Sequence, residues 1–166
     1  MLGDHAQARN YYAESLEISR TIGDRRWTSA NLNGLGLTLV EIDAYGEAGA
    51  VLAESLLLAR AIGSKPDALD ALATTGDLMA GVGQGALARQ LWHYVDAHPK
   101  SMSQARERCR ERLARHDAGE QTVDRLEIGA GLDVDPRNRI GEIIDRVHTL
   151  LLTTGDPQVK LSRTAE

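Results

Sequence analysis

The residues best suited by type to hold a metal ion lie in the last third of the chain. Asp133 and Asp135 have the spacing of the first two ligands of a calcium-binding loop, and Asn138 follows at the sixth position. Such a loop requires glycine at its sixth position and glutamate at its twelfth, whereas Gly141 and Glu142 occupy the ninth and tenth positions. The ligand set of a calcium loop is therefore not met, and a plain acidic turn is the better interpretation.

The other chemically reactive residue types also lack the partners that they would need. Gly129 and Gly131 have neither a third glycine nor a preceding strand, so they do not predict a dinucleotide site. His93 and His98 are five residues apart, which places them on different faces of a helix. Cys109 is the single cysteine, which excludes an internal disulfide or a cysteine-based zinc site. The sequence therefore predicts no enzyme, no cofactor and no metal site.

The composition favours a helical protein with a packed core. The chain has 166 residues, of which 42% are hydrophobic, 26% charged and 4% aromatic, with no phenylalanine. Abundant alanine and leucine favour helices over sheets, which rely on aromatic and β-branched residues. No apolar run approaches the ~18 residues of a membrane span, and the first residues do not resemble a secretory signal. We therefore expect a cytoplasmic, all-helical protein.

The formal net charge of −5 is unevenly distributed. Residues 1–99 contain 7 basic and 12 acidic residues. Residues 100–115 contain 6 basic and 2 acidic residues, and residues 116–166 contain 6 basic and 10 acidic residues. The basic segment could contact phosphate or nucleic acid, or it could be a capping helix with solvated arginines paired to acidic neighbours. Nucleic acid is the less favoured partner, because no aromatic residue lies between the arginines and the acidic flanks would repel a polyanion.

The chain repeats itself at an offset of forty residues. Eight positions between residues 3 and 23 are identical to the positions one offset later. These are Ala8, Ala13, Glu14, Ser15, Leu16, Arg20, Ile22 and Gly23, which fall on Ala48, Ala53, Glu54, Ser55, Leu56, Arg60, Ile62 and Gly63. Apolar residues recur at steps of three and four within each unit, so each unit is predicted to be helical.

Turn signals divide the chain into helical hairpins. Asp24 and Ser64 can cap helix starts directly after Gly23 and Gly63. We expect a repeat array at 1–116, made of a lone helix at 3–22, hairpins at 25–62 and 66–98, and a capping helix at 101–116. We also expect a loop or linker at 117–137, an amphipathic helix at 138–153 that packs on its own chain or on a partner, and a flexible tail at 154–166.

Small residues at a fixed spacing carry a resemblance to a known family. Gly36 precedes Ala48 by the same interval as Gly76 precedes Ala88, and this interval is that of the glycine and alanine of the tetratricopeptide repeat. The chain resembles this family over roughly residues 3–115, although aliphatic residues replace aromatic ones and the period is longer than the usual ~34 residues. The long repeat is also similar to those of large MalT-like bacterial signalling and transcriptional regulators. The resemblance implies an all-α, right-handed solenoid of stacked hairpins, used for protein interaction or scaffolding in the C-terminal segment of such a regulator.

The resemblance further implies which residues contact a partner. In the family, the first helix of each unit lines a concave groove. The corresponding residues here are Asn33, Leu37, Glu41, Asp70, Ala73 and Asp77. This set lacks the basic residues with which some family members hold a peptide's C-terminal carboxylate. We therefore expect a protein or peptide partner that is neutral, apolar or basic, and not an acidic C-terminal peptide.

The first helix lacks the preceding helix that would complete its hairpin. The small residue that should precede Ala8, as Gly36 precedes Ala48, would fall outside the sequence. An apolar face with Tyr11, Leu16 and Ile18 is therefore predicted to be exposed, unless the helix is a self-sufficient cap. Either this sequence is the tail of a longer array or another molecule covers the face. Self-association as a homodimer is thus an alternative function, and a remnant of a nucleic-acid-binding regulator is a second alternative.

Overall fold

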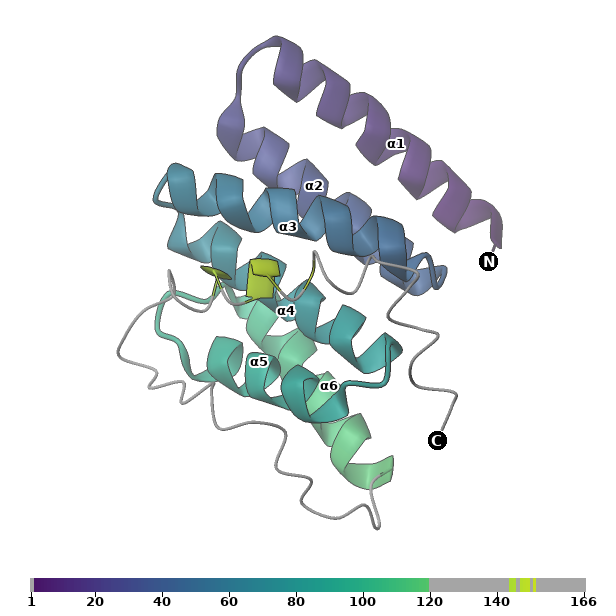
Figure 1. The fold of residues 1–166 in the computed structure, drawn as a ribbon, viewed down its shortest axis with the longest axis vertical. Helices are drawn as coiled ribbons and strands as arrows, with labels where there is room; N and C mark the ends of the chain where they lie inside the picture. The colour runs from purple at the N-terminus through teal and green to yellow at the C-terminus, as the bar shows by residue number, and fades with distance from the viewer. Residues whose placement is uncertain (1, 120–143, 146, 150, 152–166) are drawn as a thin grey trace.

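The computed structural model describes residues 2–119, 144–145, 147–149 and 151, and six helices occupy residues 2–119. They are α1 (Leu2–Thr21), α2 (Arg25–Glu41), α3 (Tyr45–Ala61), α4 (Lys65–Gly81), α5 (Gly85–Ala97) and α6 (Ser103–Gly119). Each helix packs on the next, and α4 also packs on both α2 and α6 (Figure 1). No strand occurs among the described residues, so the predicted all-α fold of stacked hairpins is confirmed. None of the described helices is both long and apolar enough to cross a membrane.

The end of α6 differs from the expected boundary. The loop predicted from residue 117 is wrong over its first three residues, because α6 continues to Gly119. The run from His116 to Ala118 contains no helix breaker, so the helix extends to the glycine. Residues 120–137 of the expected loop, most of the helix expected at 138–153 and the tail expected at 154–166 lie outside the described residues.

A residue with a positive φ angle follows each of the first four helices at intervals of twenty residues. Gly23, Gly63 and Gly83 have φ angles of 74°, 69° and 82°, and Asp43 has a φ angle of 59°. A left-handed residue ends a helix and redirects the chain, and glycine adopts this conformation without a steric penalty. One helix and its turn therefore take twenty residues, and two such segments make the forty-residue period.

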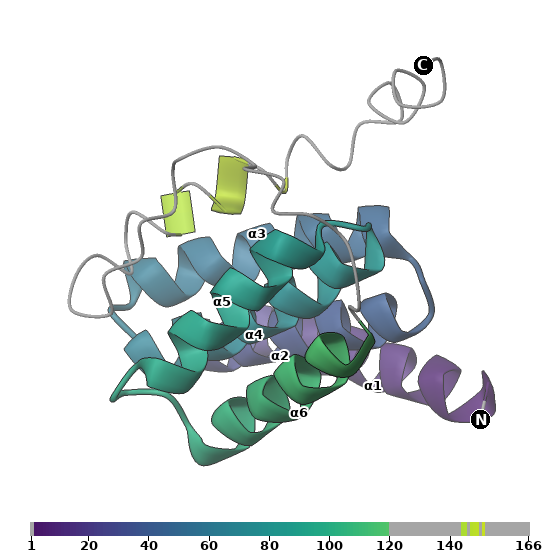
Figure 2. The same ribbon diagram turned by 90° about the horizontal axis from the view of Figure 1, so that it is seen from below.

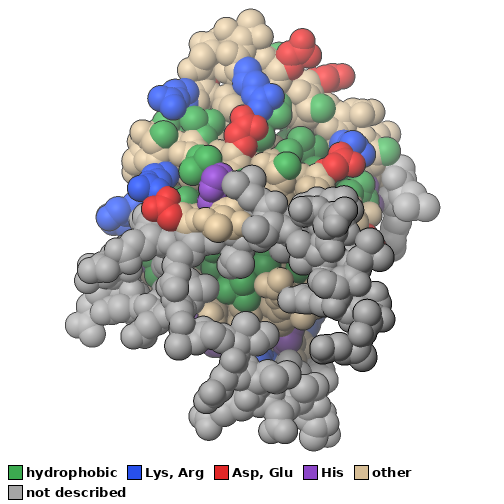
Figure 3. Space-filling model, viewed as in Figure 1, with side chains coloured by type: hydrophobic (Ala, Val, Ile, Leu, Met, Phe, Trp, Pro, Cys, Tyr) green, Lys and Arg blue, Asp and Glu red, His purple; other side chains and the backbone are tan. Residues whose placement is uncertain are grey.

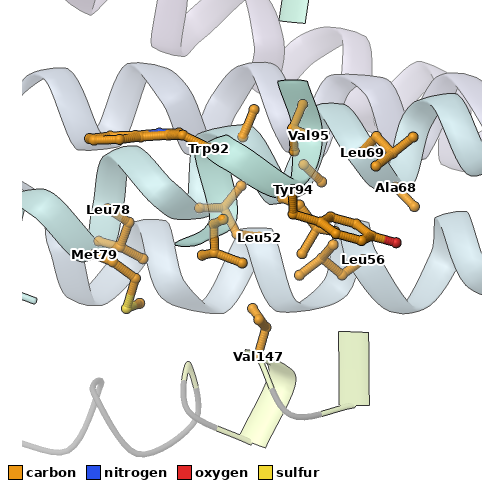
Figure 4. Packing of buried hydrophobic residues seen from close by; sticks show 14 of the residues in the cluster. Leu52, Leu56, Ala68, Leu69, Leu78, Met79, Trp92, Tyr94, Val95 and Val147 are labelled. Atoms are coloured by element: carbon orange, nitrogen blue, oxygen red, sulfur yellow. The ribbon is translucent and has the colours of Figure 1, made fainter. Parts of the chain in front are cut away.

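Glycine allows the two helices of each hairpin to cross closely. A Cβ atom on Gly36 would lie 2.6 Å from Leu52 Cδ2, and one on Gly76 would lie 2.5 Å from Trp92 Nε1. Each glycine therefore makes room for a large side chain of the following helix. Leu52 and Trp92 both belong to the buried hydrophobic cluster that runs through the stack (Figure 4).

The described residues between 144 and 151 pack against α3. Ile144, Val147 and Leu151 are buried in the same hydrophobic cluster as the helices of the stack. Arg60 of α3 and Asp145 form an ion pair. Figure 2 shows these residues on the α3 side of the molecule, opposite α6. The described part of the helix expected at 138–153 therefore packs on its own chain.

Exposed ion pairs connect α1 to α3. Arg9 Nη2 donates to Glu47 Oε2 at 2.8 Å, and Arg20 Nη2 donates to Glu54 Oε1 at 2.6 Å. Figure 3 shows basic and acidic side chains next to one another on this face, with hydrophobic side chains between them. Exposed pairs of this kind contribute about 0–1 kcal/mol each, so the packing of α1 on α2 is the main source of its stability.

Candidate partner-binding surface

Alternate helices of the stack, α2, α4 and α6, form one surface, and a row of polar side chains crosses it. Asn33 Nδ2 donates to Asp70 Oδ2 at 2.7 Å, and Arg108 Nη2 donates to Asp70 Oδ1 at 3.0 Å. Each helix contributes one of these residues. We call Asn33, Asp70 and Arg108 the central row.

A second pair of charges lies further along α4 and α6. Arg112 Nε donates to Asp77 Oδ1 at 3.1 Å, and Arg108 Nε lies 4.0 Å from Asp77 Oδ2. The Asp77 side chain is only 3% exposed, so burial raises its pKa, while Arg112 and Arg108 act to lower it. Burial also raises the pKa of Asp70, against the opposing effects of Arg108 and Asn33. The arginines of α6 thus serve as counter-charges for two largely buried carboxylates.

Two hollows lie at opposite ends of α2 and α4. The Trp27 hollow, of about 520 Å³, has a lining that includes Asp24, Trp27, Asn33, Asp67, Asp70 and Met102. The Trp92 hollow, of about 450 Å³, has a lining that includes His5, Glu41, Tyr45, Asp77, Trp92 and Arg112. Each hollow combines aromatic and carboxylate groups. Such a lining suits a partner that presents apolar and basic side chains.

Four of the six groove residues predicted from the sequence line one of the two hollows, two residues in each. The four that line a hollow are Asn33, Asp70, Glu41 and Asp77. Leu37 is half-buried and lines neither of the two hollows. The prediction for Ala73 is wrong, because its side chain is fully buried in the hydrophobic cluster and cannot contact a partner.

Sequence reasoning missed the basic residues of this surface. The predicted set contains no lysine or arginine, yet Arg108 and Arg112 reach Asp70 and Asp77. The reason is a change of register, since α6 begins two residues earlier than the forty-residue repeat predicts. This shift arises because α5 is shorter than α3, while residues 98–102 form a longer connection than the three-residue turns between the earlier helices. Asp70 and Arg108 are 38 residues apart, slightly less than the forty-residue repeat. Aligning the sequence at this shorter offset is the signal that could have revealed the central row.

The other arginines of α6 also bond within the chain. Arg106 Nη2 donates to the His98 carbonyl oxygen at 3.0 Å, Arg110 Nε to Asp96 Oδ1 at 2.7 Å, and Arg115 Nη2 to Glu111 Oε2 at 3.3 Å. Every arginine of this helix thus has a partner inside the protein. This pairing supports the interpretation of the basic segment as a helix matched to acidic neighbours.

One face of α1 is open to solvent. Tyr11 and Ile18 are 62% and 61% exposed. The prediction that Leu16 belongs to this exposed face is wrong, because Leu16 is buried where α1 packs on α2. Ile22, which is 70% exposed, was missed and lies at the end of the same helix. Its position four residues after Ile18, and therefore on the same helix face, is the sequence signal that could have identified it.

Cys109 behaves as a small hydrophobic residue. Its side chain is buried, and burial raises the pKa of the thiol to about 12, so the thiol is protonated at neutral pH. Within the part of the chain that the structure describes, no group of three His, Cys, Asp or Glu residues is placed to hold a metal ion. The calcium-like segment at 133–142 lies outside the described residues.

Comparison with known proteins gives a match over part of the chain. A family model described as tetratricopeptide repeat matches residues 1–61, which include α1, α2 and α3. No curated protein and no solved structure matches the chain. The tetratricopeptide resemblance is therefore confirmed over residues 1–61, whereas the finer resemblance to MalT-like regulators receives no support from these comparisons.

Proposed function

We propose that this chain is a protein-interaction module that binds its partner on the surface of α2, α4 and α6, and that it acts by binding rather than by catalysis. The match to tetratricopeptide repeats, which mediate protein–protein interaction, supports a protein partner in general. The observation that carries the proposal is the presence of two hollows at the ends of these helices. Exposed Trp27 and Met102 add the kind of apolar contact area from which interfaces draw much of their affinity.

The charge of the surface disfavours an acidic C-terminal peptide. Three aspartates line the Trp27 hollow, and a glutamate and an aspartate line the Trp92 hollow. Arg108 and Arg112 are already paired with Asp70 and Asp77. A partner carboxylate would meet like charges, which reduces affinity. We therefore propose a partner segment that is neutral, apolar or basic.

Site-specific photo-crosslinking in cells tests the location of the surface. A crosslinking residue at Ala30, in the Trp27 hollow, and one at Glu41, in the Trp92 hollow, should capture the same polypeptide. A crosslinker at Glu17 on the exposed side of α1 serves as the control and should not capture it. Equal capture from Glu17, or no common polypeptide from Ala30 and Glu41, would contradict the proposal. Tight, salt-sensitive binding of a peptide ending in two glutamates would contradict the proposed partner charge.

Self-association through α1 is a second candidate function, favoured by the exposure of Tyr11, Ile18 and Ile22. In the repeat, α3 is the counterpart of α1 and packs on both α2 and α4, whereas the principal neighbour of α1 in the described chain is α2. A second copy would cover the open face. We expect sedimentation velocity to show a dimer that Ile18→Glu dissociates and that Leu57→Glu, an exposed apolar position on α3, leaves intact. A strict monomer would overturn this candidate.

The wider setting is also a proposal. The long repeat period and its similarity to MalT-like repeats support a cytoplasmic bacterial signalling or transcriptional regulator. Finding an in-frame switch domain and further repeats in the neighbouring gene sequence would support this setting, and a different domain there would contradict it. A remnant nucleic-acid contact through α6 is less favoured because its arginines are paired internally. Binding to duplex DNA at low salt, where it should be strongest, would reverse that preference.

A further inference from the structure

We propose that the Trp27 hollow is a pocket for an arginine side chain of the partner. The inference rests on the proposed function, because it assigns the chemistry of one part of the same surface. The hollow lies at the first turns of α2 and α4 and combines an exposed indole, three carboxylates and a buried amide oxygen.

Acidic groups exceed basic groups around the hollow. Asp24, Asp67 and Asp70 line it together with Arg26. Arg26 Nε lies 3.5 Å from Asp67 Oδ2, but the Arg26 side chain is 73% exposed, so water and salt screen its charge. A cation that enters the hollow therefore meets an excess of negative charge.

An aromatic ring and a thioether form the apolar part of the lining. Trp27 is 58% exposed and Met102, which directly precedes α6, is 41% exposed. Both are large apolar side chains that folding leaves uncovered, and both line the same hollow. A guanidinium group stacks on an indole through a cation–π interaction, and its aliphatic stem packs on apolar side chains.

Asn33 supplies an acceptor that the described residues leave unused. Its Nδ2 donates to Asp70 Oδ2, an arrangement that identifies the other atom of the amide as the oxygen. Asn33 is only 7% exposed, and its Oδ1 accepts no hydrogen bond within the described part of the chain. A buried acceptor without a donor is unfavourable. The oxygen is covered in this structure, so a guanidinium group must displace the side chains around it. With five N–H donors in one plane, that group can then donate to this oxygen and to a carboxylate at the same time.

The carboxylates of the hollow also have capacity for another cation. Burial raises the pKa of Asp70 even though Arg108 is within hydrogen-bond distance, so a second positive charge would stabilise the ionised form. The acceptors belong to different residues, Asn33, Asp67 and Asp70. A planar guanidinium group has several N–H donors and can reach acceptors on separate residues better than the compact ammonium group of lysine can.

Peptide titration of the full chain tests the pocket. The probes are the capped pentapeptide acetyl-Gly-Ala-Arg-Ala-Gly-amide and the same peptide with citrulline, a neutral isostere, or lysine in place of arginine. NMR follows the Trp27 indole N–H and the backbone amides of Ala30 and Asn33. We expect the arginine peptide to bind at least about tenfold more tightly than the citrulline peptide, with lysine in between. Equal affinities for the three peptides, or shifts centred on Glu41 and Asp77, would overturn the proposal.

Variants separate the pocket from the rest of the surface. Trp27→Ala and Asp67→Asn should each weaken the arginine peptide by about tenfold, since each removes one recognition element. Glu17→Gln removes an exposed carboxylate of α1, outside both hollows, and is the matched control, expected to leave the affinity unchanged. Identical binding by all three variants and the parent chain would overturn the pocket assignment.

Failure of the arginine pocket and failure of the proposed function give different results in these experiments. Capture of a partner through Ala30 and Glu41, combined with no preference for arginine over citrulline, would contradict the arginine pocket and leave the interaction surface standing. Arginine-selective binding in the hollow, combined with no crosslinked partner, would support the pocket and contradict the proposed function.

Discussion

Asp77 of α4 and Arg112 of α6 are joined by a hydrogen bond of 3.1 Å, although 35 residues separate them in the sequence. The two side chains differ in burial, since Asp77 is 3% exposed and Arg112 is 34% exposed. Loss of the arginine would therefore leave a buried carboxylate, whereas loss of the aspartate would leave an arginine that water can reach. The strongly basic helix α6 is held in the stack by such pairs.

Arg112→Gln is expected to lower the free energy of unfolding by about 1–3 kcal/mol, because it removes a counter-charge from the buried Asp77 carboxylate. Urea unfolding measures the change. Arg115→Gln is the control: this arginine is 67% exposed and pairs with Glu111 one turn away, so its loss should cost less than about 0.5 kcal/mol. Equal losses in the two variants would contradict the role assigned to Arg112.

The Asp77→Asn variant is expected to gain stability relative to the parent chain as the pH rises. Burial raises the pKa of Asp77 above its ordinary value of 3.8, so the folded chain binds more protons than the unfolded chain in that window. The stability contributed by Asp77 is thus present below the unfolded-state pKa and decreases as the pH rises through the folded-state pKa. Asparagine does not ionise, so the stability of the variant minus that of the parent should increase from about pH 4 to about pH 7. Urea unfolding across this range measures the difference, and a constant or falling difference is the contrary result.

Gly76→Ala is expected to lower the free energy of unfolding by about 1–3 kcal/mol, because the added Cβ would collide with the Trp92 indole. Gly49→Ala is the matched control. A Cβ on Gly49 would make ordinary contacts, at 3.6 Å and beyond, and alanine favours a helix over glycine by up to about 1 kcal/mol. Thermal unfolding should therefore show a lower Tm for the first variant and an unchanged or higher Tm for the second. Similar effects of both substitutions would contradict the close crossing of α4 and α5.

Cys109 is expected to react slowly with a thiol reagent such as 5,5′-dithiobis(2-nitrobenzoate) at pH 8. The thiol is buried and its pKa is raised to about 12, so little thiolate is present in the folded chain. The reaction should be at least about a hundredfold slower than in the chain unfolded by urea. Comparable rates in the folded and unfolded chains would show that α6 does not bury this residue.

The repeat made most of the helices predictable from sequence, because Gly23 and Gly63 recur in the same context and both end a helix. The role of α6 could not be read in this way, since its register differs by two residues from the forty-residue period. The error at Leu16 has a different origin. Its match to Leu56, which is buried, indicates a core position, whereas the prediction of an exposed face takes no account of the packing of α1 on the helix that follows.

The candidate site was predictable only in part. Asn33 and Asp70, which the resemblance implies as contact positions, both line the Trp27 hollow. The arginines that pair with the acidic residues, and the exposed Met102, come from the segment around α6, which the forty-residue register does not connect to the groove. Trp27 lies one repeat before Asp67, in the first turn of α2, and is not among the predicted groove residues. Their contribution depends on how α6 and the first turn of α2 are placed in space, which local spacing does not specify.

Because the left-handed turns are evenly spaced, the connections between successive helix pairs have the same backbone conformation and can replace one another. A forty-residue cassette cut after Gly23 and after Gly63 contains one complete pair of helices and ends in the same backbone conformation at both junctions. Inserting a second copy of that cassette would lengthen the surface by one helix without altering either junction. Evolution, or a protein engineer, could in this way extend or shorten the surface while the chemistry at each end stays intact.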